Sequence, residues 1–319
     1  MGFKTPILLI IWRRPITTNK VIDAIRKFNP ERIYVHCDGP RKNSKNDINE
    51  VEETRKLIED KIDWPCKITK LYRKKNKGLY EGGSSAISWF FEQVEEGIIL
   101  EDDTVPGPEF LPYCEELLSK YRHDTRIWCI SGNNFQKGKW HGNASYYFSK
   151  HVGVWGWATW RRCWKKFDLE IKNWPDIKKS DLLKSMLEDP IERKYWSSMW
   201  EKTYDNPRHF NTWDLQWVYC CLINSGLTIV PNRNLVRNIG YGKDATHTLI
   251  ESKSTLTDKV LGDLKHPEFI IKNNYADRFQ FDYLHEGREK RSIFYFILNI
   301  PKKIYVFFLA RRLMFQKIK

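Results

Sequence analysis

Short apolar runs alternate with longer amphipathic segments through the first 131 residues, and this alternation constrains the fold more than any other feature of the sequence. The runs are too short for buried helices, and the first two end at the turn signals Arg13-Arg14-Pro15 and Cys37-Asp38-Gly39-Pro40. Such alternation predicts an α/β fold with a mostly parallel sheet and crossover helices. The expected strands are 6–12, 32–36, 66–72, 97–100 and 127–131, and the expected helices are 17–28, 48–61, 84–95 and 108–121.

The second half of the chain has a less regular pattern. Residues 152–164 are rich in Gly and Trp, and 181–204 form a charged stretch with helical character. An amphipathic helix is expected within 212–226, followed by a strand over 227–231. Most of the Trp residues are expected to pack in the core, although a stacking surface for a sugar or a base is the alternative.

Three segments that fall at the ends of predicted strands carry the polar residues of most interest. They are Asp38 in "YVHCDGP", the glycine-rich loop 76–83, and the three acids Glu101, Asp102 and Asp103 in "GIILEDD". In open α/β sheets, ligands bind beyond the carboxyl ends of the strands. We therefore expect these segments to converge on one crevice.

The three adjacent acids favour a site for a hard divalent cation, Mn²⁺ or Mg²⁺, because carboxylate oxygens are the ligands such ions prefer. The ion would offset the charge of a diphosphate leaving group, and without it the carboxylates would repel one another. Asp103 is the expected metal ligand, while Glu101 and Asp102 support it or contact ribose and sugar hydroxyls. The alternative is a solvated turn with helix-capping acids.

Asp214 is the single acid of a largely uncharged stretch, "FNTWDLQW", between Trp213 and Trp217. An aromatic setting tends to raise the pKa of a carboxyl group, which suits a general base. The alternative is an Asp that caps the helix expected to begin near Leu215.

The charge of the chain is strongly positive and unevenly placed. The formal net charge is +14, which favours an anionic partner such as nucleotide phosphates, an acidic membrane or nucleic acid. From residue 290 onward there are eight Lys or Arg and no acid, in a segment with two apolar runs, 293–300 and 304–310. Because this charge lies in an apolar tail and no recognised nucleic-acid-binding motif is present, we expect no nucleic-acid partner.

The C-terminal tail, residues 288–319, is expected to lie in the interface of an anionic membrane as a basic amphipathic segment. Neither of its apolar runs can cross a bilayer, and two lysines divide them. The alternative is a terminal helix packed on the catalytic domain. The seven cysteines show no C-x-x-C spacing, so reduced thiols and a cytoplasmic protein at the inner face of the cell membrane are expected.

The stretch "GIILEDDTVPGPEFLPYCEELLSKYRHDTRIWCISGNN" resembles the metal-binding segment of GT-A glycosyltransferases, most specifically the N-acetylglucosaminyltransferase I group and its bacterial relatives. Five further segments resemble that group in the same order. "PILLIIWRRP" ends in Arg14, which the resemblance places beside the nucleotide, and "YVHCDGP" supplies Asp38 for the uracil. "VGVWGWATWRRCW" resembles an acceptor-side loop centred on Gly156 and Trp157.

The last two segments complete the implied site. "FNTWDLQW" resembles the segment that supplies the catalytic base, Asp214, with Trp213 beside the acceptor. "RNIGYGKDATHT" resembles a loop that closes over the donor phosphates and contains His247, whose other interpretation is structural. The glycine-rich loop 76–83 matches poorly, and residues 165–210 and 250–319 have no clear counterpart.

The resemblance implies a GT-A fold with a catalytic domain over 1–250, divided into a nucleotide-binding half (1–135) and an acceptor-binding half (136–250), and a C-terminal extension over 251–319. It implies an inverting, metal-dependent transfer of a sugar from a nucleotide-diphosphate sugar, for which UDP is the expected nucleotide. The acceptor would be a glycan, free or lipid-linked, in bacterial surface polysaccharide assembly. The alternatives are a non-catalytic glycan- or membrane-binding relative and a basic nucleic-acid-binding protein.

Overall fold

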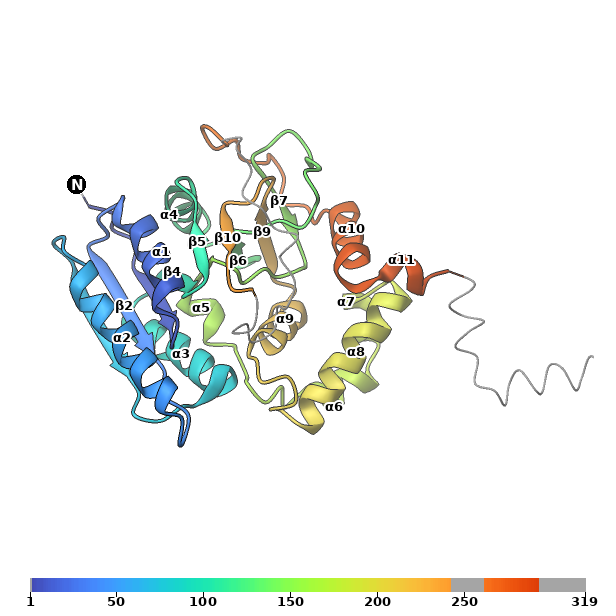
Figure 1. Ribbon diagram of the computed structural model, residues 1–319. Helices are drawn as coiled ribbons and strands as arrows, with labels where there is room; N and C mark the ends of the chain where they lie inside the picture. The colour runs from blue at the N-terminus through green and yellow to red at the C-terminus, as the bar shows by residue number, and fades with distance from the viewer. Residues whose placement is uncertain (1, 242–260, 293–319) are drawn as a thin grey trace, which may run out of the picture.

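The computed structural model describes residues 2–241 and 261–292, and within them one large sheet organises the molecule (Figure 1). Its strand order is β3-β2-β1-β4-β8-β6-β9-β7. The strands are β1 (Ile7–Ile11), β2 (Arg32–Cys37), β3 (Lys67–Tyr72), β4 (Glu96–Glu101), β6 (Ile127–Ser131), β7 (Tyr146–Ser149), β8 (Trp157–Trp160) and β9 (Leu227–Pro231). The expected α/β fold with a mostly parallel sheet is confirmed.

Two strands run against the direction of the others. β8 pairs antiparallel with both β4 and β6, and β7 pairs antiparallel with β9. All remaining pairs in this sheet are parallel. β8 therefore joins the N-terminal β3-β2-β1-β4 half to the β6-β9-β7 half in a single hydrogen-bonded sheet.

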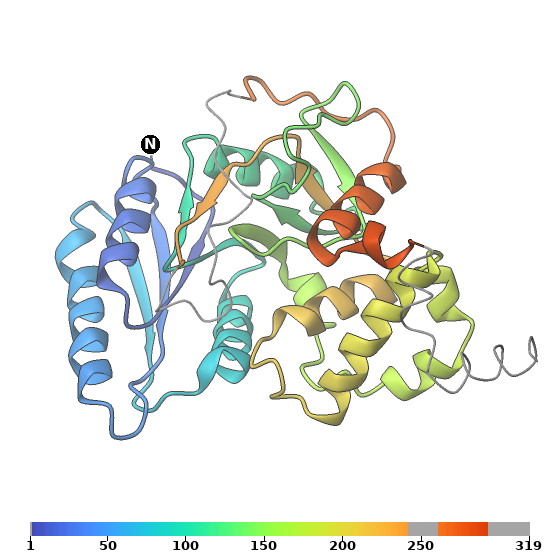
Figure 2. The ribbon, with the colours of Figure 1, turned by 45° about the vertical axis from the view of Figure 1, so that its right-hand side comes forward.

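The N-terminal half is a doubly covered parallel sheet. Helices α1 (Pro15–Arg26) and α2 (Lys45–Lys61) lie side by side on one face, and α3 (Ser84–Gln93) lies on the other (Figure 2). Burial on both faces explains why β1 is a continuous apolar run, with all five residues buried. Helix α4 (Phe110–Lys120) follows the acidic segment and packs against β4, β6 and β8.

Several elements differ from the sequence-based expectation. The strands β7 and β8 and the short pair β5 (Thr104–Pro106) and β10 (Val236–Asn238) were not expected, because their buried residues are aromatic or small and show no regular alternation. The charged stretch 181–204 is two helices, α7 (Leu182–Met186) and α8 (Pro190–Asp205), because Asp189 caps α8 and Pro190 occupies its first turn. Part of the glycine-rich loop forms a π-helical turn, η1 (Leu79–Gly83).

A layer of helices packs beside the sheet and has its own apolar core. It comprises α6 (Trp174–Lys179), α7, α8 and α9 (Asp214–Ile223), and it follows the one-turn helix α5 (Arg161–Trp164). Figure 2 shows this layer below the sheet. Six indole side chains are almost fully buried, which confirms packing as their main role: Trp157, Trp160, Trp174, Trp200, Trp213 and Trp217.

Residues 261–292 pack against the sheet edge and the helical layer. Helices α10 (Asn274–His285) and α11 (Gly287–Lys290) contact β7 and α8, and Arg291 bonds Asp189 at the start of α8. The domain boundary expected at residue 250 and most of the tail lie outside the described residues. All seven cysteines are free thiols, and no helix in the described ranges is long and apolar enough to span a membrane.

Candidate active site

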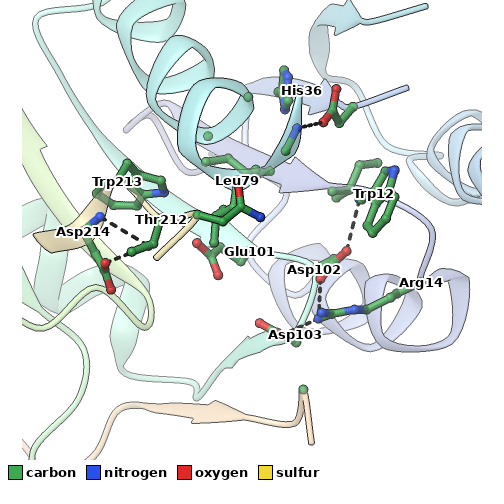
Figure 3. A pocket seen from close by; sticks show the side chains of 18 of the residues that line it. Trp12, Arg14, His36, Leu79, Glu101, Asp102, Asp103, Thr212, Trp213 and Asp214 are labelled. Carbon is green, nitrogen blue, oxygen red and sulfur yellow. Dashed lines mark hydrogen bonds and ion pairs between the residues drawn. The ribbon is translucent and has the colours of Figure 1, made fainter. Parts of the chain in front are cut away.

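A cleft with a volume of about 670 Å³ lies at the carboxyl ends of β1, β2 and β4. The three strand-end segments expected to converge do so here, since Asp38, the 76–83 loop and the acids 101–103 all line it. The opposite wall comes from residues 154–155 and from 210–215, at the start of α9. The cleft therefore lies between the N-terminal sheet and the helical layer (Figure 3).

Arg14 and two of the three acids form an ion-paired cluster on the cleft floor. The Arg14 Nη1 lies 3.1 Å from Asp102 Oδ1 and 2.6 Å from Asp103 Oδ2. Asp102 Oδ2 also accepts a hydrogen bond from the backbone N–H of Trp12, 3.1 Å away. Asp102 and Asp103 are 7% and 8% exposed, so the single guanidinium partly offsets two nearly buried charges.

Glu101 lies between this pair and Asp214, as Figure 3 shows. Burial and the charges of Asp103, Asp102 and Asp214 raise its pKa well above the usual value. Burial also raises the pKa of Asp102 to about 7, although Arg14 opposes the shift. With Asp38, five carboxyl groups thus line one cleft, and the site favours any ligand that brings positive charge.

The carboxylate oxygens of the cluster could supply part of the coordination of a hard divalent cation. Asp103 Oδ1 is buried and has no hydrogen-bond partner among the described residues. However, no group of three or more His, Cys, Asp or Glu side chains in those residues is arranged as a complete metal site. Mg²⁺-type ions are often held by one or two carboxylates together with substrate phosphates, and an ion on Asp103 would need such additional oxygens.

Gly240 closes the cluster from the side of β10. A Cβ atom at this position would lie 1.9 Å from Asp103 Oδ2, so only glycine can approach so closely. The neighbouring Ile239 N–H donates to the carbonyl of Asp103 at 2.8 Å. Sequence analysis missed this glycine, because a contact between residues this far apart in the chain leaves no local signal.

Asp38 is held by the glycine-rich loop. Its carboxylate accepts hydrogen bonds from the backbone N–H groups of Gly39, Lys77 and Gly78 at 2.8–3.0 Å. The positive φ of Gly78, 73°, suits this turn to glycine. Burial raises the pKa of Asp38 despite these donors. The structure thus shows Asp38 tying β2 to the loop, and its contact with a uracil base stays a prediction.

Trp12 is a second residue that sequence analysis missed. Its indole Nε1 donates to the carbonyl of Gly39 at 2.9 Å, which fixes the ring at the mouth of the cleft. The guanidinium groups of Arg13 and Arg41 lie 5.0 Å and 5.3 Å from the ring centroid. An aromatic ring flanked by two cations offers a surface on which a base can stack beside its phosphates.

His36 also lines the cleft and is neutral. Burial and the nearby Arg73 and Arg55 lower its pKa to about 3. Its Nε2 accepts from Arg73 Nε at 3.2 Å, so the proton of the neutral ring resides on Nδ1. Nδ1 is buried and has no partner within the described ranges.

Asp214 faces the acidic cluster from the other wall. It is the first residue of α9, and the helix N-cap is Trp213, so Asp214 does not occupy the capping position. Its Oδ1 accepts a hydrogen bond from the Thr212 hydroxyl at 2.7 Å, and its side chain is partly exposed to the cleft. The protein therefore orients one oxygen of the Asp214 carboxylate, and the side chain can contact a molecule bound in the cleft.

The aromatic residues expected at the acceptor side divide into two groups. Trp213 lines the cleft, and its ring stacks on Trp157 with centroids 5.6 Å apart. Trp157 is not among the residues that line the cleft and supports Trp213 from the core, although both rings are 1% exposed. Gly156 has a φ of 65° and packs against Val236, and the preceding Trp155 lines the cleft in its place. His247 lies outside the described residues.

Comparisons with known proteins do not assign a family. No family model and no curated protein matches the chain. A UDP-glucose pyrophosphorylase solved without ligand matches with 9% identity and a TM-score of 0.36, over 72% of this chain and 90% of that chain. A UDP-glucose pyrophosphorylase in complex with UDP-glucose matches with 12% identity and a TM-score of 0.30, over 52% and 78%.

A further match is the 4-diphosphocytidyl-2C-methyl-D-erythritol synthase of Anaerococcus prevotii, with 9% identity and a TM-score of 0.33, over 51% of this chain and 75% of that chain. Similarity this partial assigns neither family nor activity. The functional argument therefore rests on the cleft itself.

Proposed function

We propose that the protein is a metal-dependent inverting glycosyltransferase whose donor is a nucleotide-diphosphate sugar, with UDP as the nucleotide. The observation that carries the proposal is the placement of Asp214 across one cleft from the cluster of Arg14, Asp102 and Asp103. Sugar transfer with inversion needs one base at the acceptor and positive charge at the leaving diphosphate. Asp214 on one wall could act as the base, and the acidic cluster on the other wall could hold the cation that supplies the positive charge.

The donor would lie along the N-terminal wall. Its base would stack at Trp12 near Asp38, and its diphosphate would lie over the acidic cluster. Asp103 would hold the divalent cation, which supplies charge stabilisation to the departing diphosphate. Arg14 keeps Asp102 and Asp103 oriented, while Glu101 is placed to contact the ribose or the sugar.

The acceptor would enter from the side of Trp155 and Trp213. Asp214 takes the proton of the attacking hydroxyl, and the Thr212 hydroxyl orients its carboxylate for this transfer. The attack on the sugar carbon would be in line, with the base on one side of the sugar and the diphosphate on the other, as the resemblance to inverting enzymes implies. The acceptor proposed is a glycan, free or lipid-linked, in surface polysaccharide assembly, with His247 near the donor phosphates and the tail at an anionic membrane.

The first test is thermal unfolding with UDP, GDP, CDP and dTDP, each with and without Mn²⁺. A ligand present at a hundred times its dissociation constant stabilises a protein by about 2.7 kcal/mol. We expect a Mn²⁺-dependent shift with UDP that is lost in Asp103→Asn. The control is Asp60→Asn, an exposed acid on α2, which should retain the shift. No shift with any nucleotide would favour a non-catalytic relative.

Turnover tests the role of Asp214. Replacing it with Asn removes the base and keeps the shape, so we expect kcat to fall by roughly 10²–10⁴. The Mn²⁺-dependent shift with UDP should stay, because the donor wall is unchanged. A variant with wild-type kcat would assign the base to another residue.

A further inference from the structure

Both oxygens of the Asp38 carboxylate are occupied by backbone N–H groups. Oδ1 lies 2.9 Å from the nitrogen of Gly39 and 3.0 Å from that of Lys77. Oδ2 lies 2.8 Å from the nitrogen of Lys77 and 3.0 Å from that of Gly78. A carboxylate has about four lone-pair positions for hydrogen bonds, and these contacts use them. The side chain is also 7% exposed, so its principal partner is the start of the 77–83 segment.

The other end of this segment also packs on Asp38. A Cβ atom at Gly82 would lie 3.2 Å from Asp38 Oδ2 and 3.5 Å from the Cβ of Lys77. Gly82 belongs to the π-helical turn η1. The carboxylate therefore contacts both ends of the 77–83 segment and fixes the position of this segment relative to β2.

The opposite side of the 77–83 segment contacts the residues that immediately precede Asp214. A Cβ atom at Gly78 would lie 3.0 Å from Asn211 Oδ1, and one at Gly83 would lie 2.7 Å from Trp213 Cδ1. At both points the backbone of the segment packs directly on a side chain. The segment thus lies between the end of β2 and the start of α9.

Two further interactions bring this contact to the base. Glu81 of η1 bonds Arg208, which joins the same two parts of the chain at the surface, where an ion pair contributes little by itself. Thr212 lies between the two residues that the segment contacts, and its hydroxyl donates to Asp214 Oδ1 at 2.7 Å. A displacement of the 77–83 segment would therefore move the group that orients the Asp214 carboxylate.

We propose that Asp38 acts on the reaction as a positioning residue, which holds the Asp214 carboxylate in place through the 77–83 segment and the start of α9. This role rests on the proposed function, in which Asp214 is the base. It differs from the contact with uracil that the resemblance implies, since the lone pairs of the carboxylate are already used. A small movement suffices, because a shift of about 1 Å in a reacting group lowers turnover about a hundredfold.

The variant Asp38→Asn distinguishes the two roles. Asparagine keeps the size of the side chain, but its NH2 group replaces one oxygen and faces backbone N–H groups, so part of the attachment is lost. We expect kcat to fall roughly a hundredfold, measured as UDP released from UDP-glucose and from UDP-N-acetylglucosamine. The order in which UDP, GDP, CDP and dTDP stabilise the protein should stay as in the wild type.

Hydrogen exchange provides a measurement that does not depend on activity. In Asp38→Asn, the amides of Lys77 and Gly78 should exchange roughly tenfold faster, because they lose a charged acceptor. The Trp217 amide donates to the Trp213 carbonyl at 3.2 Å in the first turn of α9, and it should also exchange faster. Wild-type exchange at Trp217 would overturn the proposal. So would wild-type kcat with a changed order of nucleotides, which would assign Asp38 to the base of the donor.

Gly82→Ala is a second variant, which keeps the acid and displaces the segment from it. The added Cβ atom requires a smaller movement, so we expect a smaller fall in kcat, roughly tenfold, again with the nucleotide order unchanged. This variant decides the question if Asp38→Asn does not fold. Wild-type kcat in Gly82→Ala would count against the proposal.

The matched control is Asp277→Asn, which alters another buried acid that does not line the cleft. Asp277 accepts hydrogen bonds from the Ser149 hydroxyl at 2.5 Å and from the Lys150 backbone N–H at 3.3 Å. The control should lose stability and keep wild-type kcat and Trp217 exchange. Equally fast Trp217 exchange in both Asn variants would mean general destabilisation and would overturn the proposal. If the wild type neither binds a nucleotide nor releases UDP, the proposed function fails, while exchange at Trp217 still tests the contact.

Discussion

At the scale of single residues, the cleft combines acids that repel one another with one arginine that restrains them. Asp102 and Glu101 both have raised pKa values because they are buried beside other carboxylates. A carboxyl group with a raised pKa binds more protons in the folded state than in the unfolded state. Stability therefore falls as the pH rises from the unfolded pKa, near 4, through the folded pKa, which is about 7 for Asp102.

Because the raised pKa values lower the stability as the pH rises, the variant Glu101→Gln is expected to be more stable than the wild type. The variant removes an acid whose pKa is raised in the folded state, so the ligand-free protein should be more stable than the wild type at pH 7. The gain should shrink as the pH falls toward the unfolded pKa, near 4, because Glu101 then binds its proton in both the folded and the unfolded state. Urea denaturation at both pH values measures the difference. A variant less stable than the wild type at pH 7 would mean that Glu101 makes a favourable contact as an anion.

At the scale of elements, the π-helical turn η1 and helix α9 meet at Gly83. A Cβ atom there would lie 2.7 Å from Trp213 Cδ1, and Trp213 cannot retreat easily because it stacks on Trp157. Gly83→Ala should therefore displace the start of α9 and with it Asp214. We expect turnover to fall about a hundredfold, as for a 1 Å misplacement of a reacting group.

Gly262→Ala is the control for this prediction. A Cβ atom at Gly262 meets nothing within 4 Å, but its φ of 64° makes the substitution strained by about 1 kcal/mol. It should lower stability and leave turnover unchanged. Wild-type turnover in Gly83→Ala would show that Trp213 does not position Asp214.

The elements also show what the sequence could predict. Strands β1, β2 and β4 are mostly buried apolar runs because helices cover both faces, so their pattern identified them, whereas the edge strand β3 is only partly buried. The acids 101–103 and Asp38 were placed together because parallel strands end at one edge. Trp12 and Gly240 were missed because their roles arise from pairing with Gly39 and Asp103. β8 was missed because a strand inserted antiparallel between two others leaves no local pattern.

At the scale of the whole molecule, Arg291 ties the C-terminal helices to the helical layer. Its guanidinium donates to Asp189 at 2.6 Å and 3.1 Å and also bonds Asp282. Arg291→Ala should lower the free energy of unfolding by about 1–3 kcal/mol, since bonds to charged groups are lost. The amides of α10 should then exchange faster with solvent.

The control is Arg288→Ala, an exposed residue of α11, which should stay within about 0.5 kcal/mol of the wild type. Equal urea midpoints for the wild type and Arg291→Ala would show that α10 is held by its apolar face alone. The measurement thus separates the two attachments of α10 to the rest of the molecule.

The rings of Trp164 and Trp213 lie 5.9 Å apart, so the 48 or so residues between them leave and rejoin the protein at nearly the same place. Helices α6, α7 and α8 therefore form one excursion of the chain between two adjacent points, and the last residues of this segment, Phe210 to Thr212, line the cleft. Exchange of this segment would change the wall of the cleft that contains Phe210 to Thr212, while the sheet and its acids would stay as they are. Under the proposed function, such exchange would change the acceptor and leave the nucleotide-sugar donor as it is.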